Sequence, residues 1–216
     1  MSRNLIVFGA SEQAEIVSFY FNTFSEFRVQ AYVLDKEFIT GNSFLGKPVI
    51  DSESVVKLYP PENFEMFIAL GYSRGNLNRK NKYEEFKKWG YKFPSYLSDK
   101  AVILVDKDRI GENSLILENN TIQPFVKLGN NVVVWSGNHI GHHTTIGNHV
   151  FISSHVVISG GVAIGDACFL GVNSTIRDHI KIGANSVIGA GALVLKDCEE
   201  KSLFRGNKSN NEYLRN

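Results

Sequence analysis

An aliphatic residue returns at every sixth position over fourteen consecutive units, from Ile110 to Ile188. Neither a helix, with a period of 3.6, nor a simple strand, with a period of 2, repeats at six. A fixed short repeat is typical of a solenoid, in which each unit buries its apolar face by stacking on the next unit. The members of the series are Ile110, Ile116, Ile122, Leu128, Val134, Ile140, Ile146, Ile152, Ile158, Ile164, Leu170, Ile176, Ile182 and Ile188.

Six residues suit one short strand and one turn, so the pattern predicts parallel strands stacked about 4.8 Å apart, with the aliphatic residue pointing inward. The residue four positions later is usually small or β-branched and would fill the space beside it. A glycine follows the aliphatic residue in eight units, where it either relieves crowding or takes a positive φ at the bend. These glycines are Gly111, Gly129, Gly141, Gly147, Gly165, Gly171, Gly183 and Gly189.

This pattern resembles the hexapeptide repeat of the left-handed parallel β-helix acyltransferases. In that family three hexapeptides make one triangular coil of eighteen residues, so the 84 residues of fourteen units imply between four and five coils. The resemblance is more specific for fold than for function. The same fold occurs in carbonic anhydrase-like zinc enzymes and in proteins whose coil is only a scaffold.

The chain before the repeat predicts a small α/β domain. Residues 4–8 form an apolar run suited to a buried parallel strand, residues 12–21 carry apolar residues at helical spacing, and residues 29–34 form a second strand. This order is that of a nucleotide-binding β-α-β unit. In its first turn only Gly9 is present, with Ser11 and Gln13 where further glycines would stand, so a mononucleotide or nucleotide sugar fits better than a dinucleotide. Asp35, after the second strand, would either bond a ribose or a base or only cap the strand.

Further elements complete this domain. Residues 52–58 predict a short helix, residues 64–70 a strand and residues 77–89 a helix whose basic face, including Arg79, we expect to be solvated. We therefore expect a Rossmann-like nucleotide-sugar-binding domain over 1–97, a β-helix acyltransferase domain over 98–200 and a tail over 201–216.

Composition narrows the function classes. The net charge of +1 does not favour nucleic acid or an acidic membrane surface as a partner. No run is apolar enough for a membrane span and no signal peptide precedes Asn4, so the expected compartment is the cytoplasm. Two unspaced cysteines do not form a disulfide framework, and Cys168, at the small inward position of its repeat, is expected in the core.

The whole chain resembles the bacterial nucleotide-sugar N-acetyltransferases and the related O-acetyltransferases of sialic acid metabolism. A Rossmann-like domain, the turn Gly71-Tyr72-Ser73, the segment Phe93-Pro94-Ser95 and then hexapeptide coils carry this likeness. It implies a homotrimer that transfers acetyl from acetyl-CoA to a UDP- or dTDP-linked amino-deoxy sugar. The nucleotide would bind Gly9, Ser11 and Asp35, and acetyl-CoA would bind the coils.

All six histidines lie in the coil region. Such a transfer needs a base for the amine, and neutral imidazole suits that role near pH 7. In the resembled family the base stands in an Ile-x-His context before Ile-Gly, a place held here by His142. An acidic residue often follows it there, where this chain has His143, which is either a second catalytic residue that supports His142 or a partly exposed residue at the coil edge. His143, His149 and His155 fall in successive hexapeptides, so we expect them on three different sides of the coil.

Spacing and the resemblance suggest further site residues. Gly160 lies eighteen residues after His142, so it should sit directly above it, and Gly160-Gly161 would present a backbone N–H to the thioester carbonyl. Asn138 would line the same groove and hold the sugar, and Asn173 either points into the acetyl-CoA cleft or belongs to an asparagine ladder. The usual tail of the family is replaced by Arg205-Gly206-Asn207-Lys208.

Two other functional classes remain open at this stage. A zinc enzyme would need three imidazoles around one ion, but His143 and His179 would be two coils, about 10 Å, apart, so we expect no metal. A non-catalytic nucleotide-binding protein could keep the same fold. Acetylation of a sugar hydroxyl would need the same base as N-acetylation, so the sequence does not separate these two reactions.

Overall fold

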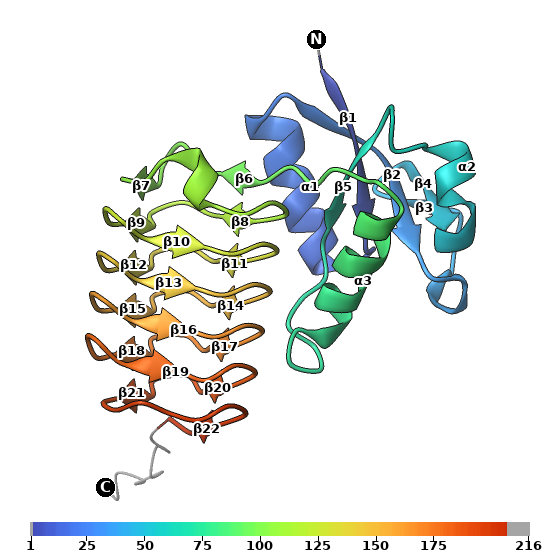
Figure 1. Ribbon diagram of the computed structural model, residues 1–216. Coiled ribbons are helices and arrows are strands. Elements are labelled where there is room, and N and C mark those ends of the chain that lie inside the picture. Colours follow the sequence, from blue (N-terminus) through green and yellow to red (C-terminus); the bar gives the residue numbers. More distant parts are fainter. Residues whose placement is uncertain (1, 207–216) are drawn as a thin grey trace, which may run out of the picture.

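The computed structural model describes residues 2–206, which form an N-terminal α/β part and a stack of coils beside it (Figure 1). The last ten residues, 207–216, lie outside the described part, and with them Asn207 and Lys208 of the divergent tail.

The N-terminal part contains a five-stranded sheet of order β3-β4-β2-β1-β5. All its neighbouring strands pair in parallel except β3 with β4. The first strand, first helix and second strand therefore form the β-α-β unit that the sequence predicts. The strands are β1 (Arg3–Phe8), β2 (Phe27–Leu34), β3 (Ser43–Phe44), β4 (Lys47–Asp51) and β5 (Glu65–Ile68).

Helices cover both faces of this sheet. Helix α1 (Glu12–Phe24) packs Ala14, Val17 and Phe21 on one face, and the coil packs on the same side. Helices α2 (Val55–Leu58) and α3 (Leu77–Lys88) pack on the other face. Short 3₁₀ helices occur at Lys36–Phe38, Ser52–Ser54 and Lys107–Arg109.

The basic face of α3 differs from the expectation at one residue. Arg79 is fully buried, and its Nη2 donates to the carbonyl oxygens of His149 and Val150 at 2.7 and 3.3 Å. Burial lowers the pKa of this guanidinium to about 9. Its long side chain is used to join α3 to the coil, which a pattern of solvated charges does not reveal.

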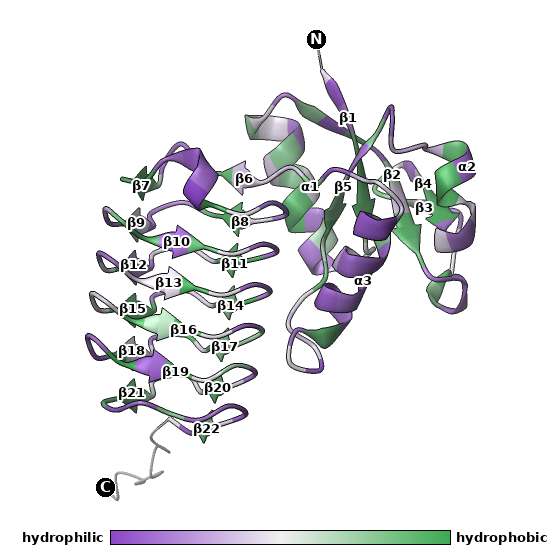
Figure 2. Cartoon of the chain, in the orientation of Figure 1, coloured by the Kyte–Doolittle hydropathy of each residue, from purple (hydrophilic) through white to green (hydrophobic). Residues whose placement is uncertain are grey.

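The coils are built from two-residue strands in three parallel sheets, which form the three sides of a prism. The docked face, against the N-terminal part, contains β6 (Tyr96–Leu97), β8 (Leu115–Ile116), β11 (Val133–Val134), β14 (Phe151–Ile152), β17 (Phe169–Leu170), β20 (Val187–Ile188) and β22 (Leu203–Phe204). The apolar face contains β7 (Val102–Ile103), β9 (Thr121–Ile122), β12 (His139–Ile140), β15 (Val157–Ile158), β18 (Thr175–Ile176) and β21 (Leu193–Val194). The polar face contains β10 (Lys127–Leu128), β13 (Thr145–Ile146), β16 (Ala163–Ile164) and β19 (Lys181–Ile182), and Figure 2 shows β10 and β19 as hydrophilic.

Every paired residue in the prism meets the residue eighteen positions away through the regular coils, as Ile140 meets Ile122 and Ile158. From Ile116 to Ile188 the repeated aliphatic residue is the second residue of its strand, and all fourteen are buried in one continuous core, together with Cys168. The predicted coil of eighteen residues with inward aliphatic ladders is thus confirmed.

The glycines after the aliphatic residues relieve crowding and do not supply positive φ. A Cβ on any of the eight would come within 3.0 Å of atoms in the following coil. Positive φ occurs two residues later, at the position held by Asn, His or Gly in most units, such as Asn131, His143 and Gly161. Asn and His tolerate the left-handed region better than most residues, which explains why histidines recur at this turn position.

The three edges of the prism have different neighbours. The α1 corner (residues 118–119, 136–137, 154–155 and 172–173) lies beside α1, because Tyr20 donates to Glu118 at 2.7 Å. The α3 corner (112–113, 130–131, 148–149 and 166–167) lies beside α3, where Arg79 is bound. The distal corner (124–125, 142–143, 160–161 and 178–179) joins the apolar and polar faces and lies opposite the docked face (Figure 1).

Candidate functional site

A hollow of about 340 Å³ lies at the carboxyl ends of β1 and β5. It is lined by Ser11, Glu12, Gln13, Ile16, Gly71 and Trp135. The strand order changes direction between β1 and β5, since β2 and β4 extend the sheet on one side and β5 on the other. The crevice at such a switch point is where open α/β sheets bind ligands.

Gly9 shapes the loop beside this hollow. Its φ is +126°, and a Cβ there would lie 2.8 Å from the carbonyl oxygen of Ala69, at the end of the neighbouring strand. Only glycine allows this close approach, so the two loops can converge. The sequence therefore places Gly9 correctly in a tight turn, while Ser11 is the predicted residue whose atoms line the hollow.

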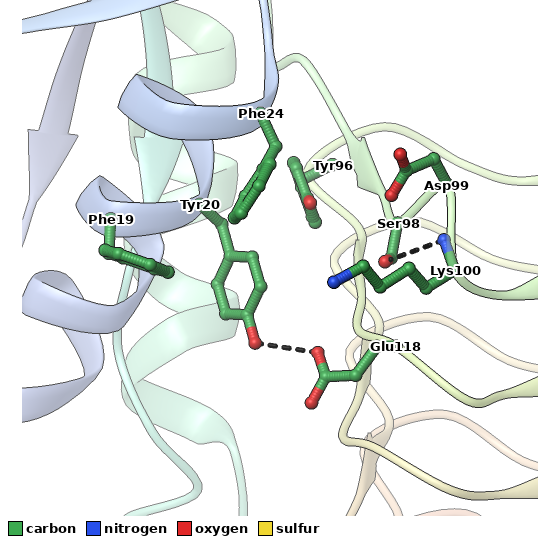
Figure 3. Close-up of a pocket in the computed structure, with 8 residues that line it drawn as sticks. All are labelled: Phe19, Tyr20, Phe24, Tyr96, Ser98, Asp99, Lys100 and Glu118. Atoms are coloured by element: carbon green, nitrogen blue, oxygen red, sulfur yellow. Dashed lines mark hydrogen bonds between the residues drawn. The ribbon is translucent and has the colours of Figure 1, made fainter.

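The hollow continues as a groove between α1 and the α1 corner. Ile16 and Trp135 line both the first hollow and a second of about 400 Å³, which also contains Glu118 and Ser136. A third, of about 310 Å³, follows beside Tyr20, Tyr96 and Lys100 (Figure 3). One groove thus runs from the β1 loop along the edge of the first coils.

Two hydrogen bonds hold a carboxylate in this groove. Glu118 accepts from Tyr20 Oη at 2.7 Å and from Ser136 Oγ at 2.6 Å (Figure 3 shows the first). Burial alone would raise the pKa of Glu118, but these donors lower it. Burial and the adjacent carboxylate raise the pKa of Tyr20 to about 12. Glu118 is therefore an ionised acceptor near neutral pH.

Asp35 lies at the end of β2 as predicted, but its carboxylate is engaged within the chain. Oδ1 accepts from Lys82 Nζ at 2.6 Å and from Ser52 Oγ at 2.9 Å. These bonds join the end of β2 to α3 and to the 3₁₀ helix Ser52–Ser54. Any bond from Asp35 to a nucleotide would add to them or replace them.

His142 lies in an exposed turn of the distal corner. Its backbone N–H donates to Gln123 Oε1 at 2.9 Å, and its Nδ1 lies 3.1 Å from Nδ1 of His143. The ring of His143 packs against that of Phe125, tilted by 35° with ring centroids 4.6 Å apart. The two adjacent histidines thus form a pair supported by residues of the preceding coil.

Gly160 lies directly above His142, as the spacing predicts. A Cβ on Gly160 would come within 2.6 Å of Cε1 and 2.7 Å of Nε2 of His142. The N–H of Gly161 donates to the carbonyl oxygen of His142 at 2.8 Å, whereas among residues 2–206 no acceptor is found for the N–H of Gly160. Of the two glycines, Gly160 is the one with an available donor beside the imidazole.

The two predicted asparagines lie in different surroundings, and neither is beside His142. Asn138 does not line the groove: it is 2 % exposed, its Oδ1 accepts from Val156 N at 2.7 Å, and its Nδ2 donates to the carbonyl oxygen of Trp135. Asn138 stands four positions after Val134, and the residue four positions after the aliphatic residue points inward in this repeat. The six-residue repeat therefore already indicated that Asn138 is buried. Asn173 is exposed on the α1 corner and does not share a corner with His142.

The groove and the histidine pair stand apart within one chain. The groove follows the α1 corner, His142 lies on the distal corner, and the apolar face separates them. That face exposes five large aliphatic side chains, each at least 40 % accessible: Val102, Leu104, Val157, Leu193 and Leu195. A patch of this kind is typical of a surface covered by another protein chain.

The remaining histidines do not converge. His143, His149 and His155 lie on the distal, α3 and α1 corners, as predicted. Within residues 2–206 no three His, Cys, Asp or Glu side chains are grouped as metal ligands would be. No helix in the same part of the chain has the length and apolar character that a membrane crossing requires.

Several groove residues were missed by sequence reasoning. Trp135, Glu118 and Ser136 point outward from the coil, where no periodic signal exists, and Tyr20 appears in the sequence only as part of an amphipathic helix. Gly71 was noted as part of a turn but not as a lining residue.

Comparison with known proteins supports the description of the coils. The family "bacterial transferase hexapeptide (six repeats)" matches residues 109–142, 126–160 and 161–196. A serine acetyltransferase of Arabidopsis thaliana is 50% identical over 44 residues, which are 20% of this chain. The match spans 12% of that relative's length, so it concerns the repeat alone.

Solved structures resemble the whole chain. The acetyltransferase domain of PglB from Neisseria gonorrhoeae, in complex with acetyl coenzyme A, is 23% identical with a TM-score of 0.76, covering 94% of this chain and 96% of that one. PerB from Caulobacter crescentus, in complex with CoA and GDP-perosamine, is 22% identical with a TM-score of 0.81, covering 93% and 92%. The chain therefore shares the two-part fold of these proteins.

Proposed function

We propose that this chain, whose coils carry the bacterial transferase hexapeptide repeat, is an acetyl-CoA-dependent N-acetyltransferase acting on a UDP- or dTDP-linked amino-deoxy sugar. The single observation that carries the proposal is His142 against the free N–H of Gly160, in a chain that also has a groove at the switch point of an α/β sheet. Proteins of the same fold were solved with acetyl coenzyme A and with CoA and GDP-perosamine. The N-terminal part would then be a Rossmann-like domain and the coil left-handed, as in the resembled family.

The groove suits a nucleotide sugar in size and chemistry. Its first hollow would take the phosphates beside the β1 loop and the N-terminus of α1, where backbone N–H groups favour anions. The indole of Trp135 offers an apolar face to a sugar or base, and Glu118 is an ionised acceptor for a hydroxyl or an ammonium group. The amino sugar would thus extend along the α1 corner.

A homotrimer would bring groove and base together. The apolar face is bordered by the α1 corner on one side and by the distal corner on the other. In a closed three-fold ring each interface joins two different edges of neighbouring protomers. If the apolar faces are buried in the ring, the distal corner of one protomer therefore lies beside the α1 corner of the next. Ser136 and His142 stand on successive corners of the same coil, six residues apart, so they are at one level along parallel prisms. The base would then reach the sugar held by its neighbour.

The reaction needs only these groups. The amine nitrogen of the sugar attacks the thioester carbonyl carbon, and Nε2 of His142 takes a proton from that amine. The N–H of Gly160 donates to the developing oxyanion, a contact that favours the transition state over the ground state. The tetrahedral intermediate then collapses, the carbon–sulfur bond breaks, and the CoA thiolate receives the proton from His142. A sugar hydroxyl could replace the amine without other changes.

The test is thiol release from acetyl-CoA with a panel of UDP-, dTDP- and GDP-linked amino sugars and free sialic acid. We expect thiol release with one nucleotide amino sugar and a loss of roughly a thousandfold in kcat for His142→Ala. His179→Ala, on the same corner two coils away, is the matched control for a replaced turn histidine. Release with sialic acid alone would assign O-acetylation. No release with any acceptor would contradict the proposal and leave a non-catalytic protein.

A further inference from the structure

The most specific unexplained feature is the contact between two ring nitrogens of the same kind. Nδ1 of His142 and Nδ1 of His143 are 3.1 Å apart, with the rings nearly perpendicular at 84°. A neutral imidazole carries one proton, on either nitrogen, so a hydrogen bond here requires one Nδ1 to be protonated and the other to be bare. The pair therefore has only two neutral arrangements that keep the contact.

The surroundings of the two rings differ. The Nε2 edge of His142 faces the backbone of Gly160, whose N–H is available, whereas the ring of His143 packs against Phe125. The His143 backbone has φ of 59°, and its N–H donates to the carbonyl oxygen of Pro124 at 3.2 Å. His143 is thus fixed from below by the preceding coil, while His142 faces the next coil.

We infer that His143 is a positioning residue, which accepts a hydrogen bond from Nδ1–H of His142 and so keeps Nε2 of His142 bare as the base. This inference rests on the proposed function and extends it. In a histidine base, the hydrogen bond made by one ring nitrogen sets the protonation of the other. When Nε2 takes the substrate proton, His142 keeps its Nδ1–H and the contact survives unchanged, whereas the reverse arrangement would place a proton on the nitrogen that must accept one.

No carboxylate of residues 2–206 takes this role. Among residues 2–206 the only His–carboxylate contacts within 4.0 Å are His149 with Glu84 and His179 with Asp178. A neutral imidazole acceptor orients the base without adding a negative charge beside it. The structure thus accounts for a histidine at a position where the resembled family often has an acid.

The direct test is nitrogen NMR of protein labelled with ¹⁵N-histidine, at about pH 8, where unperturbed imidazoles are neutral. Single variants His142→Gln and His143→Asn assign the signals. We expect the proton on Nδ1 of His142 and a bare Nδ1 on His143. A His142 ring whose Nδ1 is mainly bare would overturn the inference. This readout does not depend on finding an acceptor, so it is decided separately from the proposed activity.

Kinetics provide the second test. His143→Ala should lower kcat by roughly 10- to 100-fold while the KM for acetyl-CoA stays unchanged, because the base loses orientation and not its substrate. His143→Asn should restore most of the rate, because its Oδ1 accepts the same hydrogen bond and Asn tolerates positive φ. Equal rates for the Ala and Asn variants would contradict the inference.

The matched control is Asn185→Ala. Asn185 occupies the same turn position, with φ of 58°, on the exposed α3 side of a later coil. It carries the same backbone penalty for alanine at positive φ, so its kcat should equal that of the wild type.

Discussion

The imidazole of His142 lies against the α-carbon of Gly160 so closely that no Cβ fits between them: it would come within 2.6 Å of Cε1. This contact joins the proposed base to the backbone of the next coil. A rigid coil register of eighteen residues maintains it, because the neighbouring N–H of Gly161 is bonded to the carbonyl oxygen of His142 at 2.8 Å.

Gly160→Ala should therefore displace the ring without unfolding the coil, because an exposed imidazole can move. A misplacement of about 1 Å in a base can cost on the order of 100-fold in kcat. Steady-state kinetics and circular dichroism would check both parts. Gly41→Ala is the control, since a Cβ there meets nothing within 4 Å and φ is not positive. Full activity in Gly160→Ala would show that the observed ring position is not the active one.

The composite site predicts complementation between two inactive variants. His142→Ala removes the base, and Gly71→Trp fills the hollow, since a side chain at Gly71 meets open space. If base and groove come from adjacent protomers, trimers mixed at random should regain about a quarter of the wild-type activity, because half of the grooves and half of the bases are intact. Activity after co-expression is the measurement. No recovery would place both groups in one chain.

The apolar face predicts the oligomer. Val157, 40 % exposed at the centre of that face, should contact a neighbouring protomer, so Val157→Glu would bury a charge and break the assembly. The mass measured by light scattering should then fall from three times 24.1 kDa to 24.1 kDa, while thermal unfolding remains cooperative. Lys181→Glu, on the polar face, should remain a trimer. A monomeric wild type at micromolar concentration would contradict this.

The free energy of unfolding should decrease as the pH falls, because of His149. Burial, with a contribution from Arg79, lowers the pKa of His149 from 6.5 to about 4. The unfolded chain therefore binds a proton that the folded chain does not, so stability is complete above about pH 6.5 and decreases as the pH falls toward 4, by at most on the order of 3 kcal/mol.

The comparison for this prediction is His149→Asn, whose side chain can still accept from Asn131 Nδ2, which lies 2.9 Å from Nδ1 of His149. Denaturant unfolding at several pH values should show a steeper loss for the wild type than for the variant between about pH 6.5 and 4. Parallel curves would mean that His149 takes up its proton over the same pH range in the folded and the unfolded chain, and would contradict the lowered pKa.

The coil was predictable because each six-residue unit of the sequence shows the same pattern. Each unit repeats the same inward residue, and the resembled family has three units to a coil. Together these predict the eighteen-residue coil, the separation of His143, His149 and His155 and the place of Gly160 over His142. The first β-α-β unit was predictable for a similar reason, since a short apolar strand, a turn at Gly9 and an amphipathic helix follow one another directly.

The groove was not predictable in this way. Trp135, Glu118 and Ser136 point outward from coils that look alike in sequence, and only docking of the N-terminal part decides that their side is covered by α1. Arg79 likewise reads as a surface charge until the α3 corner closes over it.

The sequence by itself determined the repeat, the inward ladders and the separation of His143, His149 and His155 onto different sides of the coil, because every six-residue unit repeats the same inward position. Only the tertiary structure decided which face of the prism is docked, which is left apolar and exposed, and that His142 stands opposite the groove. Those choices depend on outward side chains from distant parts of the chain, which carry no periodic signal.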